Sequence, residues 1–119
     1  MRNEKKIKDT INNVIKHGWQ VVDLRNCGLE EIPKELFEHS DIVSIDLGND
    51  SFIEETQKNR ITNISKELSR IKDLSILNTE NNKVSQVSEQ VSTLRKLKKL
   101  NLENSCLKEL SEKIANMQG

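Results

Sequence analysis

The stretch WQVVDLRNCGLEEIPKELFEHSD, residues 19–41, has an apolar pattern that fits no single regular secondary structure. Its apolar residues Val22, Leu24, Leu29, Ile32 and Leu36 are spaced by 2, 5, 3 and 4 positions. A strand alternates at every second residue, and a helix follows a period of about 3.6. The pattern recurs in LSILNTENNKVSQVSEQVSTLRK (74–96) and in LKKLNLENSCLKELSEKIANMQG (97–119), each of them 23 residues long. Recurrence at a fixed period predicts a repeat architecture.

A fourth copy of the unit lies between these segments. Residues 42–73 open with IVSIDL and close with NRITNISKELSRIKD, which is the same pattern with about nine extra residues. We therefore divide the chain into a segment 1–18 and four repeats, 19–41, 42–73, 74–96 and 97–119, in one domain. Seven positions of each repeat are expected to be apolar, and Leu, Ile or Val fills 24 of these 28 positions. The ninth and eleventh positions of repeat 2 are either Asn59 and Ile61, with the insertion bulging before them, or Asp50 and Phe52.

The pattern resembles that of the leucine-rich repeat family, L-x-x-L-x-L-x-x-N/C-x-L, over about 101 of the 119 residues. The 23-residue length and the opening helix are similar to the leucine-rich regions of Roco-type GTPases and of secreted bacterial effectors. The resemblance implies an α/β solenoid, with a parallel sheet on the concave face and short helices or 3-10 turns on the convex face. It also implies that the ninth position turns inward and that Asn there bonds the main chain, as Asn59 and Asn82 would.

Two further features of the chain support this architecture. Ser65, Ser88 and Ser111 are each followed by glutamate within two residues, and Pro33 takes the same place in repeat 1, so each of these sites suits the start of a short helix. In residues 1–18, Ile7, Ile11, Val14 and Ile15 form one stripe of an amphipathic helix that ends at Gly18. We expect this helix to cover the open end of repeat 1.

Composition argues against several classes of function. Lys and Arg equal Asp and Glu at 19 each, and the chain lacks an apolar leader or membrane-length run, so we expect a protein that binds neither nucleic acid nor membrane. We expect it to be cytoplasmic unless a dedicated export machinery secretes it as an effector. The basic run RKLKK (95–99) is interpreted as a solvated face. His17 and His39 are isolated from metal-ligand patterns, and no phosphate loop or nucleophile motif is present. The sequence therefore predicts no cofactor, no metal and no enzymatic activity of its own.

The apolar residues that the core does not use point to a binding surface. Val21, Val43 and Ile76 fall on or beside the exposed strand face, and Phe52 and Ile53 fall in the insertion NDSFIEETQK. Polar residues form columns beside them, and an apolar centre with a polar rim is typical of a protein interface. The candidate partner-binding residues are Val21, Asp23, Arg25, Val43, Asp46, Phe52, Ile53, Ile76, Asn78, Glu80, Asn101 and Glu103. The alternative is that Val and Ile serve β-propensity alone and that Phe52 packs on the repeat edge.

Two classes of function follow from this surface. The chain is either a free-standing protein-interaction module or the recognition segment of a larger enzyme, such as a Roco-type GTPase or an effector ligase. We also expect a homodimer through the exposed edge of the repeat 4 strand, since an unpaired strand edge is a template for another chain.

Overall fold

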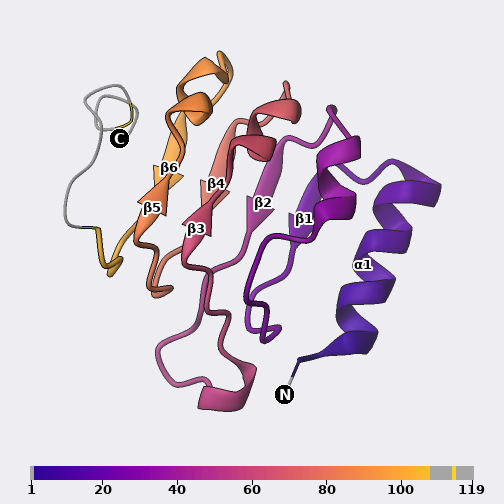
Figure 1. The fold of residues 1–119 in the computed structure, drawn as a ribbon. Helices are drawn as coiled ribbons and strands as arrows, with labels where there is room; N and C mark the ends of the chain where they lie inside the picture. The colour runs from indigo at the N-terminus through magenta and orange to yellow at the C-terminus, as the bar shows by residue number, and fades with distance from the viewer. Residues whose placement is uncertain (1, 108–113, 115–119) are drawn as a thin grey trace.

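The computed structural model describes residues 2–107 and residue 114, and it forms a stack of strand-and-return units beside one helix (Figure 1). The helix is α1 (Glu4–His17). Four strands belong to one sheet: β1 (Val21–Asp23), β2 (Ser44–Asp46), β4 (Ile76–Asn78) and β6 (Lys99–Asn101). Two belong to a second sheet: β3 (Asn63–Ile64) and β5 (Gln86–Val87). The 3-10 helices are η1 (Lys34–Glu38), η2 (Glu55–Gln57), η3 (Lys66–Arg70) and η4 (Glu89–Thr93).

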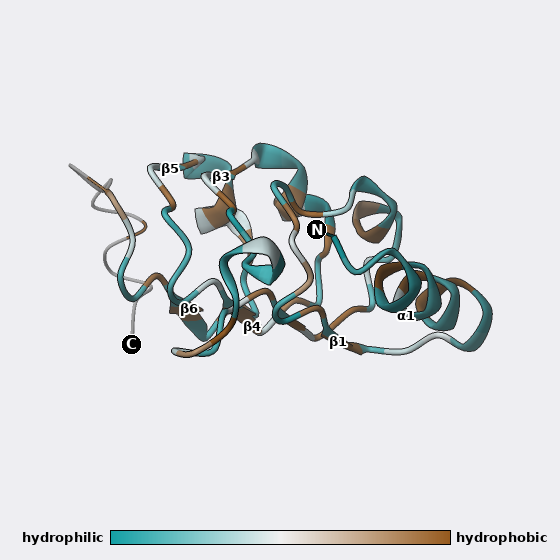
Figure 2. Ribbon diagram, turned by 90° about the horizontal axis from the view of Figure 1, so that it is seen from below, coloured by the Kyte–Doolittle hydropathy of each residue, from teal (hydrophilic) through white to brown (hydrophobic). Residues whose placement is uncertain are grey.

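The larger sheet is parallel, in the order β1-β2-β4-β6. Val21 pairs with Ser44, Ser44 with Ile76, and Ile76 with Lys99, so equivalent repeat positions lie side by side. Parallel neighbours need a crossover connection, which the return segments supply, and β3 and β5 pair in parallel within those returns. Figure 2 shows the two layers, with β1, β4 and β6 along one side, β3 and β5 along the other, and α1 at one end. The expected α/β solenoid is confirmed.

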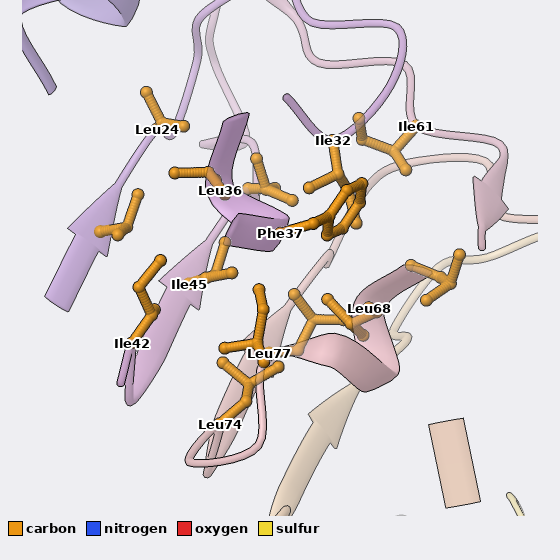
Figure 3. Packing of buried hydrophobic residues seen from close by; sticks show 14 of the residues in the cluster. Leu24, Ile32, Leu36, Phe37, Ile42, Ile45, Ile61, Leu68, Leu74 and Leu77 are labelled. Carbon is orange, nitrogen blue, oxygen red and sulfur yellow. The ribbon is translucent and has the colours of Figure 1, made fainter. Parts of the chain in front are cut away.

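The core lies between these two layers. The fourth and sixth positions point inward, because the two neighbours of a strand residue lie on the opposite face; Leu24, Leu47 and Thr79 are all fully buried. In Figure 3 the strand residues Ile45 and Leu77 lie alongside Leu36 and Leu68 of the return segments. The serine caps form as expected, with Ser65 accepting from the amide of Glu67 and Ser88 from that of Gln90.

A buried asparagine at the ninth position links the repeats. The Asn59 side chain accepts from the amides of Cys27 and Leu29, and it donates to the carbonyls of Leu24 and Leu47 at 2.8 and 3.0 Å. Asn82 does the same between repeats 2 and 3, accepting from Ile61 N–H and donating to the Leu47 carbonyl. These four-way contacts hold adjacent turns at one spacing.

The insertion leaves the solenoid at one residue, Asn49. Its side chain is buried and accepts from the Asn59 amide at 2.7 Å while donating to the Asn59 carbonyl at 2.8 Å. One side chain thus closes the base of the loop between residues 49 and 59. The loop contains η2 and adds no strand to either sheet. Asn59 and Ile61 are buried whereas Asp50 and Phe52 are exposed, which decides between the two alignments of repeat 2.

Helix α1 lies against β1 and η1. Asn3 caps its start by accepting from the Lys6 amide, and Gly18 ends it with a left-handed φ of 64°. Ile7 and Val14 are buried and Ile11 is partly buried, but Ile15 is exposed, so the apolar stripe toward repeat 1 is narrower than expected. Thr10, a polar residue, is buried whereas Ile15 is not.

One further expectation needs correction. Trp19 occupies an apolar position of the repeat, yet it is 49% exposed, because it follows directly on the Gly18 cap at the end of the stack. The buried Thr79 hydroxyl is hydrogen-bonded: it donates to the Asn101 carbonyl at 3.0 Å. Predictions on Leu110, Ser111 and Met117 lie outside the described residues, and the dimer through repeat 4 stays a prediction.

Leu47→Ala tests the core assignment. Leu47 is fully buried in the sheet layer, so the substitution is expected to lower the free energy of unfolding by about 2–5 kcal/mol, measured by urea denaturation. A loss below about 1 kcal/mol would place the side chain outside the core.

The two thiols give a second test of the fold. Cys27 is buried, burial raises the pKa of its thiol, and Cys106 is exposed. A thiol reagent such as DTNB should therefore modify Cys106 quickly in the native protein and Cys27 only on unfolding. In Cys106→Ser the fast phase should vanish; a fast phase that persists would show that Cys27 is accessible.

Candidate functional site

The concave face is the surface of the four-stranded sheet that points away from the core. Its third positions form a row across the strands, in the order Val21, Ser44, Ile76 and Lys99. Val21 is 65% exposed and Ile76 is 39% exposed. They are separated by one strand, so about 9–10 Å divides their backbones. Val43, which precedes β2, is half-buried.

The fifth positions form a second row, and their side chains hold the turn that follows each strand. Each side chain accepts a hydrogen bond from the amide two residues later: Asp23 from Arg25, Asp46 from Gly48, Asn78 from Glu80, and Asn101 from Glu103, at 3.0–3.1 Å. This Asx geometry turns the chain out of each strand. The row is therefore part of the fold, and it leaves the face polar at this level.

Arg25 connects three repeats across the concave face. Its guanidinium donates to Asp46 at 3.1 Å, to Glu80 at 3.0 Å and to Asp50, the first exposed residue of the insertion, at 2.8 Å. Asn78 also donates to Asp46, at 3.0 Å. One cation therefore organises three carboxylates from repeats 2 and 3.

Gly48 makes that reach possible. It occupies the seventh position of repeat 2, between Arg25 of repeat 1 and Glu80 of repeat 3. A Cβ at Gly48 would stand 2.6 Å from Arg25 Nη1 and 3.0 Å from Glu80 Cγ, so the Arg25 guanidinium would have to shift. Because position 48 carries no side chain, Arg25 can reach across repeat 2 to Glu80.

The network shifts the titration of its members. Burial works against the charge of the guanidinium, but the hydrogen bonds to Asp50 and Glu80 and the charge of Asp46 outweigh it and raise the pKa of Arg25. The hydrogen bonds from Arg25 and Asn26 hold the pKa of the Asp50 carboxyl below its usual value. Both groups are charged throughout the neutral range.

The insertion carries its apolar residues away from the sheet. Phe52 is 100% exposed, so it does not pack on the repeat edge, and Ile53 is half-buried. The loop's first residues are fixed to repeat 1, because Asp50 accepts from Arg25 and from Asn26, while its amide donates to Asn26 at 2.9 Å. The Gly28 amide also donates to the Gln57 carbonyl, at 3.0 Å.

The structure brings some of the predicted residues together and leaves others apart. Arg25, Asp46, Asn78 and Glu80 share one hydrogen-bonded network. Val21 and Ile76 lie on the same row and make none of the network's hydrogen bonds, and the Asn101 side chain bonds the Glu103 amide within repeat 4. Phe52 stands apart on the insertion.

Three functional residues were not predicted: Gly48, Asn49 and Asp50. A signal for Asn49 was present, because the eighth position is asparagine in every repeat, as Asn26, Asn49, Asn81 and Asn104. The other three adopt left-handed φ values of 56–63°, which asparagine tolerates well. Asn49 departs from that conformation and closes the insertion instead.

Within the part of the chain that the structure describes, no group of three or more His, Cys, Asp or Glu side chains could hold a metal ion. No described helix combines the length and the apolar character needed to cross a membrane. The arrangement on the concave face is suited to binding through charge and apolar contact.

Arg25→Gln tests the network through its pH dependence. The folded-state pKa of Asp50 lies below its unfolded value, so the ion pair stabilises the fold above the ordinary aspartate range and that contribution is lost as pH falls through the folded-state pKa. The thermal midpoint of Arg25→Gln should therefore lie below wild type at neutral pH. The two midpoints should converge below pH of about 4.

The control for that experiment is Arg95→Gln, the same change at an exposed position in the turn before β6. It should leave the midpoint near wild type at every pH. A deficit in Arg25→Gln that stays constant down to acid pH would mean that its carboxylate partners do not stabilise the fold.

Comparison with known proteins identifies the fold. No protein-family model matches the chain, and no curated protein matches it. Among solved structures, it is similar to a leucine-rich repeat protein of Leptospira interrogans, with a TM-score of 0.59 and 22% sequence identity over 94% of this chain. The match spans 32% of the Leptospira chain. The protein described here has the fold of a short leucine-rich-repeat solenoid.

Proposed function

We propose that this chain is a protein-interaction module that binds a partner protein on the concave face and on the insertion. The observation that carries the proposal is the exposure of Val21 and Ile76 on one row of the sheet. Large apolar side chains on a strand face that no other element covers gain free energy when a partner buries them, at about 25 cal/mol per Å².

The polar part of the face favours binding in a second way. Arg25 already pairs with Asp46 and Glu80, so a partner that covers this part of the face does not leave the guanidinium without a carboxylate. Asp23, Asn78, Asn101 and Glu103 form the remaining rim. A rim of this kind gives specificity, while the apolar centre supplies the affinity.

The insertion extends the proposed surface beyond the sheet. Phe52 is fully exposed on a loop whose base is fixed by Asn49 and whose first residue is held by Arg25. Aromatic residues dominate interface energies when a partner buries them. A loop with a fixed base loses less conformational freedom on binding than a free one.

A second candidate function is the recognition segment of a longer, enzymatic protein. The observation in its favour is that the similar Leptospira chain is about three times as long as the segment matched here, since the match spans 32% of it. In that case the concave face would bind a substrate protein or an internal regulatory surface. A GTPase or ligase sequence in the same reading frame would select this function.

Ile76→Glu tests the binding surface. The substitution places a charge in the centre of the apolar row, so it should abolish capture of the partner from native lysate while the thermal midpoint stays near wild type. Val43→Glu should act in the same direction. Capture is measured by affinity pull-down and mass spectrometry.

Lys66→Glu is the control, because it changes the charge of an exposed residue in η3 on the return side. It should leave capture unchanged. Loss of capture in Lys66→Glu with retention in Ile76→Glu would move the binding site to the convex side and overturn the proposal.

A further inference from the structure

Acidic groups are concentrated on two rows of the concave face. The fifth and seventh positions together with Asp50 hold five carboxylates, Asp23, Asp46, Asp50, Glu80 and Glu103, against one guanidinium, Arg25. Five negative charges against one positive leave a net charge of −4. The only other ion pair to this set within the described residues comes from Lys6 of α1, at 4.0 Å from Asp23.

The apolar row runs parallel to these acidic rows. It lies two residues earlier along each strand, and its exposed members are Val21 and Ile76, with Ser44 between them and Lys99 at its end. Two residues of a strand separate it from the fifth-position row by about 6–7 Å, and the seventh positions lie two residues further along the chain. The face thus presents an apolar row and an acidic row side by side.

We propose that the occupant of this face is an extended segment of a partner protein in which Lys or Arg side chains accompany apolar ones. This inference rests on the proposed function, since it names the chemistry of the partner bound at the same surface. Apolar side chains of the segment contact Val21 and Ile76. Its cations lie over Asp23 and Glu103 on the acidic rows.

The dimensions of the sheet match such a segment. Four strands spaced by about 4.8 Å span about 14 Å, the length of four or five extended residues. Two carboxylates within this span lack a close cation. Glu103 is exposed with no ion pair among the described residues, and Asp23 has only the 4.0 Å contact with Lys6. These are the positions where added positive charge gains most.

The same charges disfavour other occupants. An acidic peptide, a nucleic acid or an anionic membrane would meet repulsion from the acidic row, because like charges brought together at an interface disfavour association. A second copy of this chain that presented the same face would suffer the same repulsion. Complementary charge leaves the basic segment as the occupant that fits.

Selection from a phage-displayed library of random dodecapeptides tests the inference. The purified full chain is immobilised, and enriched clones are sequenced and then measured as fluorescein-labelled peptides. We expect enriched peptides to carry net positive charge with apolar residues interleaved, and to bind more weakly as ionic strength rises. Glu103→Lys and Ile76→Ser should each weaken their binding by about tenfold.

The matched control is Glu89→Lys, which makes the same charge change at an exposed residue of η4 on the return side. It should leave peptide affinity unchanged. Enrichment of neutral or acidic peptides, failure to enrich any peptide, or an equal loss in Glu89→Lys and Glu103→Lys would overturn the inference. The proposed function would fail separately, through capture that Ile76→Glu does not disturb.

Discussion

The structure depends on the buried amide of Asn59, which satisfies four backbone groups in two repeats. Where the chain leaves the parallel sheet to return over the other face, its backbone groups lose their hydrogen-bond partners in the neighbouring strands. The freed amides and carbonyls are then buried away from water. Each such group left unpaired would cost about 1–3 kcal/mol. The side chain replaces the lost ladder, so the chain can turn at this point of repeats 1 and 2 without that cost.

Repeat 1 shows what happens without such an amide of its own. Cys27 cannot accept and donate as asparagine does, and its thiol donates only to the Arg25 carbonyl, at 3.3 Å. The amides of Cys27 and Leu29 are instead satisfied by Asn59 of the next repeat. Its Cys27 carbonyl is paired from the other side, by the Asn3 amide ahead of α1. The helix therefore completes the hydrogen bonding of the first turn as well as covering its apolar end.

The repeat tolerates the insertion because hydrogen bonds between Asn49 and Asn59 join the two ends of the loop. Asn49 pairs with both backbone groups of Asn59, so the ladder residue keeps its place however many residues lie between. Loop closure costs only about 0.6 kcal/mol for each doubling of loop length. A single buried amide can therefore support an excursion that carries Phe52 into solvent without disturbing the stack.

The repeat pattern predicted most of the fold because periodic burial is a local property of the sequence. The inward positions of Leu24 and Leu47, the caps at Ser65 and Ser88 and the end of α1 at Gly18 follow from spacing and residue type alone. The exposure of Trp19 did not follow, since it depends on the position of a repeat within the stack. A pattern averaged over repeats treats the first and the middle repeat alike.

The candidate site was less predictable because its contacts join residues far apart in sequence. Arg25 and Glu80 are separated by 55 positions, and their contact depends on the length of one side chain and on the absence of another at Gly48. The repeat register placed Arg25 and Glu80 at the same position of their repeats, but it did not predict that they form an ion pair. Asp50 entered the network only because the Asn49 closure and Asn26 place it beside Arg25.

The internal pairing of Arg25 also determines what the surface can recognise. With its guanidinium shared among Asp46, Asp50 and Glu80, the central cation is no longer available to an acidic ligand, although the sequence alone would offer it as one. Under the proposed function, a partner would meet the remaining carboxylates beside the exposed Val21 and Ile76. A Cβ at Gly48 would stand 2.6 Å from Arg25 Nη1, so the guanidinium keeps its present place beside Glu80 because this position is glycine.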